Sequence, residues 1–365
     1  MNWLSRGWRV LVNAAALAAT FLQRTLGMDT MTNDDVGGSS KSFDMQISVS
    51  GFNEDDGTKL GNVIAEIIKK VCAAGIDLSA LEGVTVTPNY REMLSAFDTG
   101  LPTRPTPTAE KFANGQAMAV TCKRGDDFKS HLFFDADILS PLLFGTEPER
   151  ALATNVLAHE LAHVYDSGRL AKELANQPFP NDLTGWLFLM TNATWSEYFA
   201  CLVTAETDPS LDDYITTFLN ALGQYPEAIR EQIAAYRRHS DTQRLMDFVQ
   251  GRVSLLFKFA GYVLGNLDGT GRQLAQTHPD AWQSIQDAGF SEAWIGIASA
   301  LQRMESGRPW QNISIYDELG RAALGYLNSL GMFPRNDGDR IYVAIPQPTP
   351  GLMIHPPTNS GLTNS

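Results

Sequence analysis

The five residues His159-Glu160-Leu161-Ala162-His163 constrain this chain more than any other stretch. Two histidines four residues apart lie on one face of a helix, one turn above each other, so their rings can converge on one metal ion. Glu160 is rotated by about 100° from His159, which lets its carboxylate reach a metal-bound water rather than the metal. The pattern H-E-x-x-H is typical of a zinc hydrolase in which the carboxylate takes a proton from that water.

The residues around this motif predict that it lies on a helix. Thr146 and Glu149 have the spacing of a capping box, and Pro148 suits the first helical turn. Apolar residues then recur at helical spacing through the motif. We therefore expect a helix over residues 147–165, with the two histidines in its C-terminal half.

The motif resembles that of the zincin superfamily of zinc metallopeptidases. The chain departs from the metzincin branch, because Asp166 stands where that pattern has glycine and Arg169 where it has a third histidine. The resemblance is therefore to the gluzincin branch, in which a glutamate on a downstream helix supplies the third ligand. It implies one Zn²⁺ per chain, held by His159, His163 and such a glutamate.

Glu197, within residues 194–200, is the main candidate for the third ligand, because a small residue follows it three positions on, as in the second gluzincin motif. We expect it on a helix over residues 195–206. Thr194 and Glu197 also form a capping-box pattern that needs no metal. Glu206 and Asp166 remain alternatives, Asp166 more as a partner that orients His163 than as a ligand.

The resemblance also implies a substrate-binding strand and a donor to the developing oxyanion. In zincins the strand just before the motif helix is an edge strand that pairs with an extended peptide, which assigns this rim to residues 130–136. Candidates for the donor are Tyr198 and the cluster Tyr236-Arg237-Arg238-His239. The cluster also suits the C-terminal end of a helix, where positive charge is favourable.

Composition limits the classes of partner. The formal net charge of −13 argues against nucleic acid, which favours basic patches. No apolar stretch is long enough for an integral membrane span. The three cysteines, Cys72, Cys122 and Cys201, are widely spaced and give neither a disulfide framework nor a cysteine zinc site. The resemblance to zincins implies a peptide or protein substrate, and the oligomeric state stays open.

The two ends of the chain differ from the rest. Arg6 and Arg9 precede an apolar stretch over residues 10–22 that resembles a weak signal peptide with a poor cleavage site. We expect a cytoplasmic protein, with export through this segment as the alternative. Residues 1–41 are assigned to this apolar segment and a flexible linker, and residues 346–365, rich in Pro, Thr and Asn, to a disordered tail.

The remaining pattern predicts an α+β fold with a small mixed or antiparallel sheet. Residues 42–208 form the expected zincin-like catalytic lobe, and residues 209–345 a mainly helical lobe. Residues 167–191 are expected to be mostly irregular. The expected strands are 42–50, 84–87, 117–122, 131–136 and 340–345; further helices are 60–71, 90–97, 211–222, 226–239, 242–264, 278–287, 291–304 and 314–330.

These patterns predict a zinc-dependent metallopeptidase with Glu160 as general base. Two alternatives remain at this point. One is a zinc-bearing domain with a regulatory or binding role, and the other is a zinc hydrolase that acts on a small amide or ester. A Glu160→Gln variant that retained all biological effect would favour the regulatory role. Cleavage of a peptide library would separate the peptidase from the hydrolase of small amides or esters.

Overall fold

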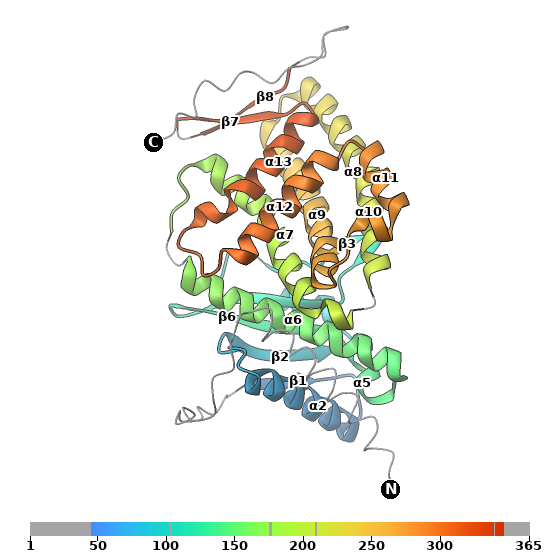
Figure 1. The fold of residues 1–365 in the computed structure, drawn as a ribbon. Helices are drawn as coiled ribbons and strands as arrows, with labels where there is room; N and C mark the ends of the chain where they lie inside the picture. The colour runs from blue at the N-terminus through green and yellow to red at the C-terminus, as the bar shows by residue number, and fades with distance from the viewer. Residues whose placement is uncertain (1–44, 103, 175–176, 209, 339, 347–365) are drawn as a thin grey trace. The chain divides into compact units, whose positions relative to one another are not determined.

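The computed structural model describes residues 45–102, 104–174, 177–208, 210–338 and 340–346. The predicted signal-like segment and linker, and nearly all of the predicted C-terminal tail, lie outside these residues. Helices and strands occur together throughout the first part of the chain, and helices dominate the second (Figure 1). The predicted α+β class is confirmed.

A four-stranded sheet has the order β1-β2-β6-β5. β1 (Gln46–Val49) and β2 (Leu81–Thr87) are parallel, as are β2 and β6 (Asp127–Asp135), whereas β5 (Ala117–Arg124) pairs antiparallel with β6. Gly125, at φ 64°, provides the left-handed turn between β5 and β6. β2 is buried along most of its length, as expected for an interior strand.

The strand order corrects one prediction. Residues 130–136 were expected to be the edge strand beside the substrate, but β6 is an interior strand with partners on both sides. After β5 the chain turns back, and β6 is inserted between β5 and β2. β5 is therefore the edge strand. The hairpin itself was predicted, but the side on which it joins β2 depends on pairing between distant segments.

Two helices pack against this sheet. α2 (Glu54–Ala73) begins at Asn53, whose side chain accepts a hydrogen bond from the backbone N–H of Asp56, and it packs against β1. α6 (Glu147–Glu173) packs against β5 and β6, so that in Figure 1 the strands lie between α2 and α6. The short helix α3 (Tyr90–Ala96) follows β2, and α4 (Ala136–Leu139) and α5 (Pro141–Phe144) lie between β6 and α6. β3 (Ala109–Glu110) and β4 (Ala113–Asn114) form a separate small hairpin.

The predicted irregular segment over residues 167–191 is wrong. α6 continues to Glu173, and α7 (Asp182–Thr204) includes the apolar run that precedes residue 191. Asn181 begins α7, because its side chain accepts hydrogen bonds from the backbone and hydroxyl of Thr184. The helical break is confined to the short stretch that contains Pro178 and Pro180.

After α7, the described residues form helices followed by one hairpin. Pro226 was expected to separate two helices, but it lies inside one continuous helix. A proline there removes a single backbone N–H donor, and the turns on both sides keep their own hydrogen bonds. The elements are α8 (Leu211–His239), α9 (Thr242–Gly269), α10 (Leu274–Thr277), α11 (Pro279–Asp287), α12 (Ser291–Ser306), α13 (Asp317–Ser329), β7 (Phe333–Asp337) and β8 (Arg340–Ala344), with 3₁₀ turns at Ala205–Thr207 and Ile313–Tyr316.

The chain groups into two compact units. Unit 1 comprises Met1–Ala175, Ser196–Thr217 and Tyr262–Gln273, and unit 2 comprises Asn176–Trp195, Phe218–Gly261 and Leu274–Ser365. Unit 1 contains the four-stranded sheet and α6. Unit 2 has a core of interlocking rings, formed by Phe218, Phe257, Phe290, Trp294 and Tyr326. The predicted division into independent lobes at residue 208 stays a prediction.

No helix among the described residues is both long and apolar enough to cross a lipid bilayer.

Candidate metal site

α6 places His159, Glu160 and His163 in a buried group that could hold a metal ion. The helix begins as predicted, since Glu149 accepts a hydrogen bond from the backbone N–H of Thr146 at 2.7 Å. All three residues of the group are less than a tenth exposed, and one ligand atom from each lies within 4.8 Å of the others. A single helix therefore fixes this part of the site through its own turn spacing.

α7 brings Glu197 to the same group. Glu197 Oε2 lies 3.1 Å from His159 Nε2 and 3.2 Å from His163 Nε2, and the two Nε2 atoms are 3.1 Å apart. The expected partner of the two histidines is therefore the residue that the structure brings to them. Because Glu197 lies in the interior of α7, its alternative role in a cap at Thr194 is wrong.

The three atoms form a triangle that suits a small tetrahedral metal. Zinc bonds of about 2.0–2.1 Å place tetrahedral ligand atoms about 3.3 Å apart. The observed separations of 3.1–3.2 Å need only a slight expansion to reach that value. Two neutral imidazole nitrogens and one carboxylate oxygen are also a donor set that zinc accepts, and they leave a fourth position for water. The residues therefore fit the ion that the motif predicts.

Residues of α7 lie next to the Nδ1 atoms of both histidine rings. His163 Nδ1 lies 2.9 Å from Ser196 Oγ, and His159 Nδ1 lies 4.0 Å from Cys201 Sγ. Ser196 is thus a partner of His163, while Asp166, predicted to orient His163, is buried one turn further along α6 and stays a prediction in that role. Glu206, the other alternative ligand, is exposed in the 3₁₀ turn after α7.

Burial and charge act on the titratable groups around the triangle. Burial alone would lower the pKa of His159, but its hydrogen bonds to Cys201 and Glu197 outweigh that effect and hold the pKa above its ordinary value. Burial raises the pKa of the Cys201 thiol to about 11, so the thiol is neutral near pH 7. Cys201 is therefore a buried thiol beside a histidine ring.

Tyr262, from α9, is a residue of this site that the sequence did not indicate. Its ring stacks on that of His159 with 6.0 Å between centroids, and its hydroxyl hydrogen-bonds to Glu197. Burial, followed by the charge of Glu197, raises the pKa of Tyr262 well above its ordinary value, so the phenol keeps its proton. No spacing rule joins Tyr262 to the motif, because the two are more than ninety residues apart.

Three glycines explain how α9 comes close enough to α7. A Cβ atom on Gly261 would lie 2.5 Å from the carbonyl oxygen of Thr194. On Gly265 and Gly269 it would lie under 3.0 Å from the carbonyl oxygens of Tyr198 and Leu202. Side chains at these three positions would force the two helices apart. Tyr262 directly follows Gly261, so the same close packing brings it toward α7.

Two sets of residues were predicted as oxyanion donors. The hydroxyl of Tyr198 donates to Asp268 at 2.9 Å and is committed to that bond. Tyr236 belongs to the last turns of α8 in unit 2, where Arg237, Arg238 and His239 are exposed. This is the helix-end arrangement that their charges were expected to favour.

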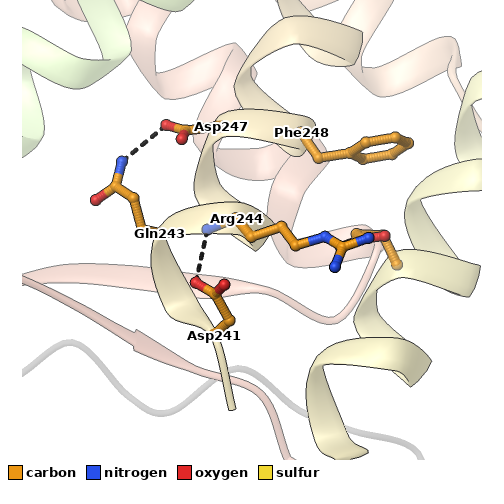
Figure 2. Close-up of a pocket in the computed structure, with 6 residues that line it drawn as sticks. Asp241, Gln243, Arg244, Asp247 and Phe248 are labelled. Atoms are coloured by element: carbon orange, nitrogen blue, oxygen red, sulfur yellow. Dashed lines mark hydrogen bonds between the residues drawn. The ribbon is translucent and has the colours of Figure 1, made fainter. Parts of the chain in front are cut away.

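Unit 2 contains an open hollow with a volume of about 700 Å³ where α8 and α9 meet (Figure 2). Its two carboxylates are engaged within α9. Asp241 accepts a hydrogen bond from the backbone N–H of Arg244, and Asp247 accepts one from the side chain of Gln243. These are local contacts at a helix start, and they give the hollow no chemical group comparable with the histidine group.

The chain matches no family model, and comparisons with curated proteins and with solved structures likewise found no match. The inference of function therefore depends on the residues of the site.

Proposed function

We propose that the protein is a zinc-dependent metallopeptidase of gluzincin type. The observation that carries the proposal is the triangle of His159 Nε2, His163 Nε2 and Glu197 Oε2, with the carboxylate of Glu160 beside it. A helix with H-E-x-x-H and a glutamate from a second helix is the arrangement that the sequence predicted. The three triangle residues would hold the metal, and Glu160 would act on the water.

The chemistry follows from the groups present. Zinc, when bound, lowers the pKa of a coordinated water to about 7 and polarises a substrate carbonyl. With the ion bound, Glu160 would be the general base that takes a proton from the attacking water, and it would give that proton to the leaving amine. The low exposure of all four side chains limits bulk water at the site and strengthens each charge interaction there.

The position of β5 favours a peptide over a small amide or ester. β5 is an edge strand, and the motif helix packs against it. An extended peptide could add to its free edge through backbone hydrogen bonds, so we assign to β5 the substrate rim that was first expected at residues 130–136. The backbone N–H of Lys123 already donates to Thr99, which confines this role to the earlier residues of β5.

A Glu160→Gln variant tests the proposal. We expect wild type and variant each to bind one zinc per chain, and hydrolysis of a quenched fluorescent peptide library to fall at least about 100-fold in the variant. Glu147→Gln, an exposed change in the first turn of the same helix, is the matched control and should keep full activity. Unchanged hydrolysis in Glu160→Gln would contradict the role of Glu160. A zinc-loaded wild type that cleaves only small amides or esters would contradict peptidase activity.

A further inference from the structure

We propose that Ser196, Cys201 and Tyr262 are positioning residues, and that each of them contacts a different one of the three ligand side chains. The proposal rests on the metal site proposed above and names the residues of this chain that orient it. Ser196 and Cys201 come from α7, and Tyr262 from α9. Every ligand thus has a partner on a helix other than the one that carries its own backbone.

The direction of the two histidine bonds follows from which nitrogen faces the site. Both Nε2 atoms point into the triangle, and a nitrogen that binds a metal carries no proton. Each ring must then carry its proton on Nδ1 and donate it outward. The Nδ1–H of His163 donates to Ser196 Oγ at 2.9 Å, a full hydrogen bond.

His159 has a weaker hydrogen-bond partner than His163. Its Nδ1–H faces Cys201 Sγ at 4.0 Å, and a thiol sulfur is a poor acceptor. Metal-bound histidines usually donate to a carboxylate, a backbone carbonyl or water. Here a fully buried thiol stands in that place, one helical turn after Glu197. We therefore expect the His159 ring to be held by the packing around it more than by this bond.

Tyr262 acts on the third ligand. The Tyr262 ring stacks on that of His159, and its phenol O–H is the donor in the hydrogen bond to the Glu197 carboxylate. The ring of Tyr214 also stacks on that of Tyr262, with 5.0 Å between the ring centroids. Tyr262 therefore contacts two of the three ligands, and its own ring packs against a further aromatic ring.

Zinc affinity, measured by competition with a chromophoric chelator on the full chain, tests these roles without any substrate. Loss of such a partner typically lowers metal affinity 10–100-fold. We expect losses of about this size for Ser196→Ala and Tyr262→Phe, and a smaller one for Cys201→Ala. Ser196→Thr keeps the hydroxyl and should restore affinity. Tyr262→Phe keeps the ring, so its effect reports the hydrogen bond.

A second readout covers the case in which a variant does not fold. In the zinc-loaded wild type, nitrogen-15 NMR should show both imidazoles protonated at Nδ1, with the His163 proton protected from solvent exchange.

Thr204→Ala is the matched control for the affinity measurement. It removes a hydroxyl of α7 that donates to the backbone carbonyl of Ala200, and it should leave zinc affinity unchanged.

The outcomes separate this proposal from the one on which it rests. Zinc affinity within about twofold of wild type in both Ser196→Ala and Tyr262→Phe would overturn the positioning roles and leave the metal site intact. Protonation of either ring at Nε2 in the zinc-loaded protein would also overturn them. A wild type that binds no zinc would overturn both proposals.

Discussion

Helices α6 and α7 supply the same site in different ways. α6 carries His159, Glu160 and His163, whose relative positions follow from the turn of one helix. α7 supplies Glu197, whose position relative to the histidines depends on how two helices pack. That packing is set in part by α9, which meets α7 through glycines. The difference separates geometry that is local in the sequence from geometry that only the fold provides.

The largest expected effect tests whether the two helices contribute equally to metal binding. His163→Ala should abolish stoichiometric zinc binding, because it removes a ligand from α6. Glu197→Ala should lower zinc affinity by more than about 100-fold, since a ligand must matter more than a residue that only orients one. Zinc content and chelator competition on the purified variants measure both. Unchanged affinity in Glu197→Ala would remove α7 from the ligand set.

The next effect concerns the packing of α9 on α7. Gly265→Ala places a methyl group against the carbonyl of Tyr198 and the Cβ of Cys201, and should lower the free energy of unfolding by about 1–3 kcal/mol. Gly251→Ala lies on the same helix with no heavy atom within 4 Å of the added carbon. It should raise the free energy of unfolding by up to about 1 kcal/mol, because alanine favours helix.

Denaturant unfolding of the two glycine variants provides the comparison. If the free energy of unfolding falls in Gly265→Ala and rises in Gly251→Ala, the close approach of α9 to α7, rather than helix propensity, governs the Gly265 position. Zinc affinity should fall with Gly265→Ala and stay constant with Gly251→Ala, since only the first displaces residues around Glu197. Equal stabilisation by both changes would contradict the close packing.

The smallest effect concerns the end of α6. Lys172 bonds to Asp77 at 2.8 Å, and this bond, with those from Ser79, lowers the pKa of Asp77 to about 2. A lowered carboxyl pKa stabilises the folded state above the ordinary value of 3.8, and this stabilisation is lost as pH falls toward 2. Both side chains are more than half exposed, so solvent limits the contribution to less than about 1 kcal/mol.

Asp77→Asn measures this contribution. Wild type should be slightly more stable than the variant at pH 6, and the difference should shrink as pH falls from about 4 to about 2. Zinc affinity at pH 7 should not change, because the turns of α6 that carry the histidines are held elsewhere. A difference that grew at low pH would contradict the pairing with Lys172.

The sequence predicted α6 well because its signals are local. The start at Thr146 and the spacing of the histidines need no knowledge of the fold. The choice of Glu197 also agrees with its position beside them, and there the argument came from a resemblance rather than from spacing. Tyr262 was missed because it meets the site only through the packing of α9 on α7.

The errors have a related cause. The first half of α7 is apolar on several faces, so it lacks the alternation that indicates a surface helix. It was therefore taken as part of an irregular segment. The position of β6 was wrong because sheet order depends on which distant strands meet, and a hairpin pattern is the same whether its first or its second strand becomes the edge.

The glycines of α9 also affect how the chain tolerates substitution. Gly261, Gly265 and Gly269 carry no chemical group, yet each faces a backbone carbonyl at a distance that a side chain would violate. In a saturation mutagenesis experiment scored for folded protein, these three positions should accept almost no replacement, whereas Glu160 should accept several. The same experiment scored for activity would make Glu160 equally intolerant. The two scores together would separate the glycines, which are needed for folding, from Glu160, which we propose is needed for catalysis.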